Sequence, residues 1–366
     1  MANKRILDIL SKITLLILSL IISFIIGIAI ESYFFCPPSS DISWRDSNIQ
    51  FDSELGWKPF PGRSIITFGD KKVSSNSSGF RSPEIDSSKE HILVAGDSVA
   101  WGYGVGDDET VSSYLQGLTG SENRNFQVLN LGVSGYAVDQ YLMHLQKNIS
   151  KTNPRVIIVI FCQNNDLCET GRNYAWGKSK PLFTIKHGKL ENINKHVHKY
   201  SRTSLLTSSR ISNSRLFQFL INTIAPSGRL HQIILGQKEL NPDLRDSVCA
   251  ALIGQIHDLA ARHNASLLFV ISPSKRYFTD RDDYSLNSSY LYFKNLFDKN
   301  GCNYIDFFER VTHDKTNVDK LFLHDDDCHY SPYGNKYLAK VIYEKLEVIQ
   351  VWERQFPDPS VWKMCY

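Results

Sequence analysis

The sequence predicts an α/β protein in which a parallel β-sheet of about five strands is covered by helices on both faces, with one apolar helix ahead of this domain. Two observations support this fold class. Between residues 91 and 350, short apolar runs rich in β-branched residues alternate with segments of helical periodicity, an order that builds a parallel sheet through right-handed crossovers. Ahead of them, Ile13–Ile30 is a run of 18 uncharged, mostly apolar residues, nearly long enough to cross the hydrocarbon core of a bilayer.

The composition is that of a folded protein and argues against nucleic-acid binding. The chain has 366 residues, of which 42% are hydrophobic and 12% aromatic, so a sizeable core can form. The formal net charge of +3 is too small to indicate a nucleic-acid partner, and the sequence has neither a long basic tract nor zinc-finger cysteine spacing. Seven cysteines allow disulfides in an exported protein, but the sequence does not assign their pairing.

Charges on either side of the apolar run predict how it lies in a membrane. Three basic residues precede the run, whereas Glu31 and Asp41 follow it. By the positive-inside rule, the N-terminus stays in the cytoplasm and the rest of the chain lies in the periplasm or outside the cell. We therefore expect residues 1–36 to form a cytoplasmic tip and a single transmembrane anchor. A cleaved signal sequence is the alternative, because Gly27–Ala29 offers small residues to a signal peptidase.

Residues 37–90 are expected to form a stem, followed by irregular or short β-structure that lies against the main domain. The segment is rich in Ser, Pro, Gly and Asp, and two of its pieces, Leu55–Pro59 and Asn76–Arg81, combine a turn pattern with an aromatic residue. Neither piece has helical periodicity. No catalytic role is assigned to this segment.

The main domain is expected over residues 91–350, and a tail of residues 351–366 follows it. The predicted strands are 91–95, 127–131, 156–161, 267–271 and 304–307, and the predicted helices are 110–118, 136–149, 246–263, 289–299 and one that begins after Ser331. Ser331 suits the N-cap of the last helix, and Pro332 suits its first position.

Residues 167–245 are too many for a simple connection in such a domain, so we interpret them as an insertion. From Arg172 to Arg202 the insertion has eight Lys or Arg and three His against one acidic residue, Glu191. Such a run is usually a solvated surface. In a chain with a membrane anchor, it can instead contact anionic lipid headgroups or an acidic glycan.

Residues suited to acyl chemistry follow the first three predicted strands. Gly96 and Asp97 form a tight turn after the first strand, and this turn presents Ser98 where ligands enter open α/β sheets. Gly132 follows the second strand and Asn165 the third, so all three features are expected at one edge of the sheet. Ser98 suits a nucleophile, whereas the Gly132 backbone N–H and the Asn165 side-chain amide suit the binding of an oxyanion.

Asp326 and His329, near the other end of the chain, supply what a serine nucleophile needs. A serine hydroxyl reacts only when a base takes its proton, and the base works best when a carboxylate orients it. His329 stands in the loop just before the last helix, from which it can reach the edge of the sheet. We therefore predict a triad of Ser98, His329 and Asp326.

These motifs resemble the four blocks of the SGNH hydrolases, also called the GDSL esterase/lipase family. The matching positions are Gly96–Ser98, Gly132, Asn165–Asp166 and Asp326–His329, which occur in the family's order. The resemblance implies a flavodoxin-like three-layer α/β/α domain, in which Ser98 is the nucleophile, His329 the base and Asp326 the residue that orients the base. With the apolar run near the N-terminus, we expect a membrane-anchored member of the family. It also implies an oxyanion hole made by the backbone N–H groups of Ser98 and Gly132 and the side chain of Asn165.

The chain departs from the family pattern at two positions. Gln163 stands where the third block usually has glycine, so a bulkier side chain can narrow the acyl pocket or change how Asn165 is presented. Val99 replaces a leucine at an apolar position of the first block.

Other polar residues near these motifs are expected to have structural roles. Ser134 is better explained as a turn residue than as a nucleophile, and Asp97 is expected to accept backbone N–H groups of its own turn. His324–His329 contains side chains that bind metals, but the sequence has no second matching cluster. Cys328 is either a buried thiol or half of a disulfide.

We expect a serine ester hydrolase that forms an acyl-enzyme, needs no cofactor or metal, and acts on an acylated carbohydrate or another small ester of the cell envelope. An O-acyltransferase of envelope polysaccharide would use the same residues, and a catalytically weak glycan-binding or assembly protein is a third hypothesis. The sequence does not define the acyl chain length, the alcohol part of the ester or the oligomeric state.

Overall fold

The computed structural model describes residues 2–34, 48–121, 125–176, 178–197, 237–280 and 284–351, together with positions 214–216, 219 and 223. The chain divides into two compact units, of which one contains the N-terminal helix and the other begins at Asn48 and contains the central β-sheet. Three parts of the chain lie outside the described residues. They are the expected stem up to residue 47, most positions from 198 to 236 in the expected insertion, and the tail after residue 351.

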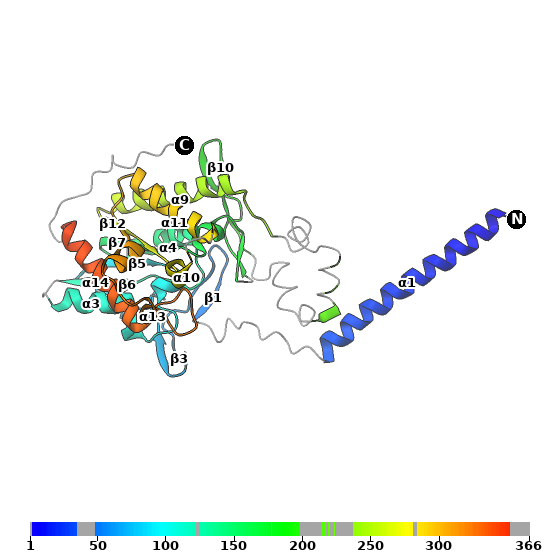
Figure 1. Ribbon diagram of the computed structural model, residues 1–366, viewed down its shortest axis with the longest axis horizontal. Helices are drawn as coiled ribbons and strands as arrows, with labels where there is room; N and C mark the ends of the chain where they lie inside the picture. The colour runs from blue at the N-terminus through cyan, green and yellow to red at the C-terminus, as the bar shows by residue number, and fades with distance from the viewer. Residues whose placement is uncertain are drawn as a thin grey trace. The chain divides into compact units, whose positions relative to one another are not determined.

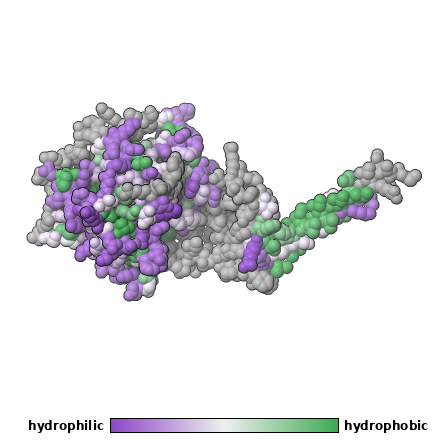
Figure 2. Space-filling model, viewed as in Figure 1, coloured by the Kyte–Doolittle hydropathy of each residue, from purple (hydrophilic) through white to green (hydrophobic). Residues whose placement is uncertain are grey.

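Helix α1 (Ala2–Phe34) contains the apolar run near the N-terminus. Its segment Asp8–Glu31 has 24 residues. At 1.5 Å per residue this is about 36 Å, more than the roughly 30 Å of a bilayer core. Hydrophobic residues cover most of this segment in Figure 2, and its large apolar side chains are exposed. Helix α1 is therefore long and apolar enough to cross a membrane, and a signal sequence has the same properties.

Five parallel strands form the central sheet, as expected. They are β5 (Glu90–Gly96), β6 (Phe126–Asn130), β7 (Pro154–Cys162), β12 (Ser266–Ser272) and β13 (Tyr304–Asp306), and the predicted strands match them to within two residues at each end. The order across the sheet is β13-β12-β7-β5-β6, which is the flavodoxin-like order. The chain direction across the sheet reverses between β5 and β7, the place where open α/β sheets bind ligands beyond the carboxyl ends of their strands.

Helices cover both faces of this sheet (Figure 1). On one face, α3 (Val111–Ser121) packs against α14 (Pro332–Val348), and on the other, α4 (Val138–Asn148) packs against α9 (Pro242–Arg262) with α11 (Tyr284–Lys299) nearby. The shorter helices are α2 (Ser98–Trp101), η1 (Asp107–Glu109), η2 (Ile149–Lys151), α5 (Asp166–Thr170), α10 (Lys275–Thr279), α12 (Phe307–His313) and α13 (Val318–Leu321).

Alternate residues of each strand face the two helical layers. Ile92 of β5 packs in the same core cluster as Leu115 of α3 and Leu338 of α14. On the opposite face, the ring of Phe161 in β7 lies 6.2 Å from that of Tyr141 in α4. Burial on both faces explains why these strands are continuous apolar runs in the sequence and do not alternate with polar residues.

Two β-hairpins precede the sheet. They are β1 (Ile49–Asp52) with β2 (Gly56–Pro59), and β3 (Ser64–Thr67) with β4 (Lys71–Ser74). Trp57 of β2 is buried, donates its indole N–H to the Ser134 carbonyl at 3.0 Å, and packs against the ring of Tyr136. The first hairpin therefore lies against the loop that follows β6.

The segment expected to be an insertion, residues 167–245, contains β8 (Tyr174–Ala175), β9 (Lys178–Ser179), and a hairpin of β10 (Phe183–Lys186) and β11 (Lys189–Asn192). Lys180 does not lie on the solvated surface that its basic run predicts, because it is fully buried. Its ammonium binds Asp139 at 2.5 Å and the carbonyl oxygens of Glu169 and Arg172 at 3.1 Å. A lysine can be buried here because a carboxylate and hydrogen-bond acceptors replace its water.

Candidate active site

The turn after β5 presents Ser98 at the carboxyl edge of the sheet. Gly96 has φ +152°, and a Cβ there would lie 2.7 Å from the carbonyl oxygen of Ile160, so the close approach of the two backbones requires glycine. Asp97 Oδ1 accepts the backbone N–H of Val99 at 2.8 Å, which confirms that this side chain braces its own turn. Ser98 is the first residue of α2.

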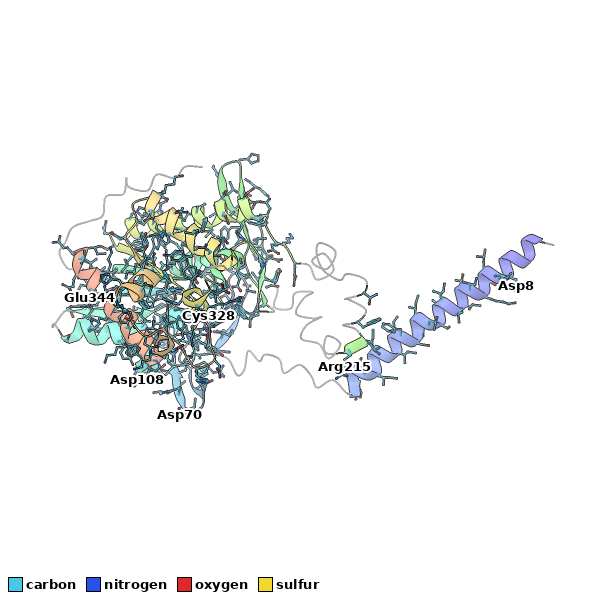
Figure 3. All side chains as sticks on the ribbon, viewed as in Figure 1. Asp8, Asp70, Asp108, Arg215, Cys328 and Glu344 are labelled. Carbon is cyan, nitrogen blue, oxygen red and sulfur yellow. The ribbon has the colours of Figure 1, made fainter. Side chains whose placement is uncertain are left out.

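The loop before α14 carries Asp326 and His329 to the same edge of the sheet; Figure 3 labels Cys328 in this loop. His329 Nε2 lies 2.9 Å from Ser98 Oγ, and His329 Nδ1 lies 2.7 Å from Asp326 Oδ2. Ser98 and His329 are 231 positions apart in the chain. The three side chains predicted to form a triad are thus brought together at hydrogen-bonding distances.

Hydrogen bonds favour the ionised form of Asp326. Burial alone would raise its pKa, but hydrogen bonds from the His329 side chain and from the backbone N–H groups of Cys328 and His329 hold the pKa below its ordinary value. The two N–H groups lie 2.8 and 2.9 Å from Oδ1. An ionised Asp326 accepts a hydrogen bond from His329 Nδ1, which leaves Nε2 as the acceptor that faces Ser98.

Backbone contacts position the loop that carries His329. The Leu323 N–H donates to the His329 carbonyl at 2.9 Å, which closes the loop on itself. Directly afterwards, Ser331 caps α14 by accepting the Gly334 N–H at 3.1 Å, and Pro332 occupies the first turn, as predicted. His329 therefore lies just before the start of a well-capped helix.

Asn165 stands just after β7, at the N-cap position of α5. Its Nδ2 lies 3.4 Å from Asp97 Oδ2, and the Ser98 hydroxyl lies 3.4 Å from the same oxygen. The amide of Asn165 and the hydroxyl of Ser98 thus approach one carboxylate oxygen from neighbouring strands. The Asn165 amide donates to Asp97 and stands beside Ser98, where an oxyanion would form.

Asp166 has a structural role at the site, and the sequence motifs alone do not reveal this role. It is fully buried; Oδ2 accepts the Cys162 N–H at 2.8 Å and Oδ1 accepts the Tyr141 hydroxyl at 2.7 Å. Burial and the neighbouring Asp97 charge raise the pKa of Asp166 well above its ordinary value. Helical periodicity places Tyr141 on a buried face, but it does not reveal that the phenol joins α4 to the end of β7.

Gly132 has a different environment from the one expected. Its N–H donates to Asn130 Oδ1 at 2.9 Å, so it would have to leave a buried acceptor to bind an oxyanion. A Cβ on Gly132 would lie 2.4 Å from Trp101 N, and close packing against α2 therefore explains the glycine. This geometry does not favour the expected role of the Gly132 N–H in an oxyanion hole.

Gly135, three residues later, is a better candidate donor that the sequence reasoning missed. It has φ +78°, a conformation that favours glycine. The Ser134 carbonyl accepts a hydrogen bond from Trp57, and because the peptide bond is trans, the Gly135 N–H points in the opposite direction. The sequence shows two glycines in this loop, but it does not reveal which of the two N–H groups is already used.

Comparison with known proteins assigns the family. Residues 94–337 match the model of the GDSL-like lipase/acylhydrolase family, which is more than half of the chain. The chain belongs to this family. It is a carboxylic ester hydrolase with the five-stranded sheet described above. No curated protein matches the sequence of this GDSL-like hydrolase.

Several solved structures are similar to this GDSL-like hydrolase. A lipase/acylhydrolase from Enterococcus faecalis is 12% identical, with 71% of this chain and 96% of that chain covered and a TM-score of 0.42. A mutant of an acetyl-xylooligosaccharide esterase from Geobacillus stearmophilus is 12% identical, with 70% and 94% covered and a TM-score of 0.42. A psychrotrophic esterase from Pseudoalteromonas is 11% identical, with 72% and 99% covered and a TM-score of 0.39.

Gln163, where this GDSL-like hydrolase departs from the family pattern, points toward β12. The side chain is buried, and its Oε1 accepts the Ser274 N–H at 3.4 Å. Its backbone N–H donates to the Ser272 carbonyl at 3.0 Å. The extra side chain therefore joins the ends of β7 and β12.

Cys328 is a free thiol beside the triad, which answers the question that the sequence left open. Its Sγ lies 2.7 Å from Asn164 Nδ2.

Among the described residues, Ser134 Oγ is buried and makes no hydrogen bond, in keeping with a turn residue. No group of three or more His, Cys, Asp or Glu side chains in the described part of the chain could hold a metal ion.

Proposed function

We propose that Ser98 is the nucleophile of this ester hydrolase, that His329 is its general base, and that Asp326 orients and stabilises the imidazole. One observation carries the proposal: an unbroken chain of contacts from Ser98 Oγ to His329 Nε2 at 2.9 Å and from His329 Nδ1 to Asp326 Oδ2 at 2.7 Å. These distances and roles are those of an activated serine.

The reaction proceeds in two halves. As Ser98 Oγ attacks the ester carbonyl carbon, His329 Nε2 takes the hydroxyl proton and the carbonyl electron pair moves onto oxygen. The oxyanion then collapses, the carbon–oxygen bond to the alcohol breaks, and His329 gives the proton to the departing alcohol. In the second half, His329 takes a proton from the water that attacks the acyl-enzyme. The bond from the acyl carbon to Ser98 Oγ then breaks, His329 returns the proton to Ser98 Oγ, and the carboxylic acid is released.

In this proposal the oxyanion is bound by the backbone N–H of Ser98 and the side-chain amide of Asn165. Gly135 replaces Gly132 as the third donor, because the Gly132 N–H already donates to Asn130 and the Gly135 N–H is turned away from Trp57. Each such donor acts at the oxygen on which charge develops, so its effect is mainly on kcat.

The alcohol part of the substrate is proposed to be a carbohydrate. Trp176 is 63% exposed and has φ +52°, an unusual conformation for a bulky residue. Its indole lies against Gly135, where a Cβ would be 2.7 Å from Trp176 Cδ1. An exposed aromatic face beside the oxyanion donors is suited to stack on the apolar face of a sugar ring. Replacing Trp176 by Ala should raise KM for an acetylated oligosaccharide and leave KM for p-nitrophenyl acetate unchanged, and equal effects on both would contradict this assignment.

Helix α1 is proposed to be a retained anchor that leaves the hydrolase unit in the periplasm or outside the cell. The length of Asp8–Glu31 and the basic residues ahead of it support this topology. Protease added to intact cells, or to spheroplasts if the source has an outer membrane, should digest the hydrolase unit. A mature chain that lacks residues 1–29 would instead show a cleaved signal sequence.

The catalytic proposal is tested by replacing Ser98 with Ala. Turnover of p-nitrophenyl acetate should fall to background while the circular dichroism spectrum and the thermal unfolding midpoint stay near those of the wild type. Ser134→Ala is the matched control, because it removes a hydroxyl from the neighbouring loop without touching the triad. Undiminished turnover by Ser98→Ala would reject the assignment.

A second experiment separates hydrolysis from acyl transfer. Candidate glycans are added to the reaction, and the amount of acylated sugar is compared with the amount of free acid.

A further inference from the structure

The ring of Tyr103 lies on the imidazole of His329, a contact that neither the motifs nor the proposed reaction uses. The ring centroids are 4.4 Å apart and the planes are inclined by 34°, so the two rings face each other. Tyr103 follows α2, in the loop after the nucleophile, and 40% of its surface is exposed. A cation within about 6 Å of an aromatic centroid is attracted by the negative face of the ring.

A second aromatic residue holds Tyr103 in this position. Phe68 lies at the tip of the β3–β4 hairpin, on which Figure 3 labels Asp70. Its ring contacts Tyr103 edge-on at 4.8 Å. Phe68 has φ +50°, which is uncommon for a bulky side chain. Backbone strain of this kind persists where the surrounding structure requires a particular placement of the side chain.

Arg81, the last residue of the Asn76–Arg81 piece, also holds the loop that carries Tyr103, through hydrogen bonds to the backbone of that loop. The guanidinium is buried and donates to the carbonyl oxygens of Trp101, Gly102 and Val105 at 2.6 to 3.0 Å. Its Nε also binds Asp107 at 3.0 Å. A planar guanidinium with several donors in fixed directions is well suited to hold three carbonyl groups.

We propose that Tyr103 is a positioning residue for His329, and that the segment of residues 48–90 acts in catalysis by holding Tyr103 there. The ring keeps the imidazole in the orientation that faces Ser98, and its negative face stabilises the imidazolium that forms when His329 takes the Ser98 proton. This inference rests on the proposed role of His329 as the general base. Through Phe68 and Arg81, it gives a function to the segment of residues 48–90, to which the sequence assigned no catalytic role.

The test compares kcat and KM for p-nitrophenyl acetate in the full-length protein. Tyr103→Leu removes the ring and should lower kcat about 2- to 30-fold with KM unchanged, which is the range expected for losing one cation–π contact. Tyr103→Phe keeps the ring and should restore kcat to near the wild-type value. Phe68→Ala should lower kcat less than Tyr103→Leu does, and it should add nothing when combined with Tyr103→Leu.

Ile66→Ala is the matched control, because Ile66 lies on the same hairpin and is 68% exposed. It should leave kcat unchanged. An unchanged kcat in Tyr103→Leu, an increase in KM alone, or a failure of Tyr103→Phe to restore kcat would each overturn the inference. If Tyr103→Leu does not fold, Phe68→Ala decides alone, since an unchanged kcat there overturns the inference as well. Activity retained by Ser98→Ala would instead reject the proposed function itself, so the two failures are distinguishable.

Discussion

Replacing Asp326 by Asn should lower kcat about 10⁴-fold, as expected for the loss of the carboxylate from a Ser–His–Asp triad. Asp326 Oδ1 accepts two backbone N–H groups, at 2.8 and 2.9 Å, so an asparagine must keep its carbonyl oxygen at that position. Its NH₂ group then faces His329 Nδ1, which becomes an acceptor. His329 Nε2 carries the proton in that tautomer and cannot accept one from Ser98.

A 10⁴-fold loss of kcat corresponds to an increase of about 5.4 kcal/mol in the activation free energy. The assay is steady-state turnover of p-nitrophenyl acetate at pH 7, with circular dichroism to verify folding. Asp325→Asn is the matched control: its carboxylate is 86% exposed, it binds only His324 among the contacts described for it, and Asn tolerates its φ of +58°. A folded Asp326→Asn enzyme that keeps more than a tenth of wild-type kcat would refute the reasoning from the tautomer.

Three further predictions concern the surroundings of the triad. Asn165→Ala should lower kcat about 10²- to 10³-fold with little change in KM, because it removes one oxyanion donor; stopped-flow acylation rates check this. Burial raises the pKa of Glu169 from 4.5 to about 7. The native state thus holds a proton that the unfolded chain lacks between these values, and the free energy of unfolding should fall by roughly 3 kcal/mol as pH rises through this window. Glu169→Gln should flatten this dependence in urea titrations at several pH values, and an unaltered slope would contradict the assignment. Asp139→Asn leaves the Lys180 ammonium buried and unpaired, so it should cost roughly 3–5 kcal/mol in the free energy of unfolding, whereas a double Asp139→Leu, Lys180→Met variant should lose less.

The central sheet could be predicted from the sequence because its strands are buried on both faces. Runs such as Val156–Phe161 have no polar residue to interrupt them, and glycine or small polar residues mark their ends. The order of the strands could be predicted only from the family resemblance, because the hydrophobic periodicity of a strand does not show which strands are its neighbours.

The meeting of Ser98, His329 and Asp326 could also be predicted, because the chemistry of a serine nucleophile restricts the residue types and the sequence offers them in one order. The hydrogen bonding in the loop after β6 could not be predicted. Gly132 and Gly135 are the same residue type, and only the Asn130 side chain, which accepts the Gly132 N–H, separates their roles. The burial of Lys180 cannot be predicted from its basic surroundings either, because its partner Asp139 is 41 positions away in the sequence.

The most direct test of the account is a structure of the protein after reaction with a fluorophosphonate. The account predicts a covalent bond from Ser98 Oγ to phosphorus, with the phosphonyl oxygen bound by the Asn165 amide and the Gly135 N–H and with His329 Nε2 beside the adduct. Absence of labelling, or an adduct on another serine such as Ser134, would contradict it.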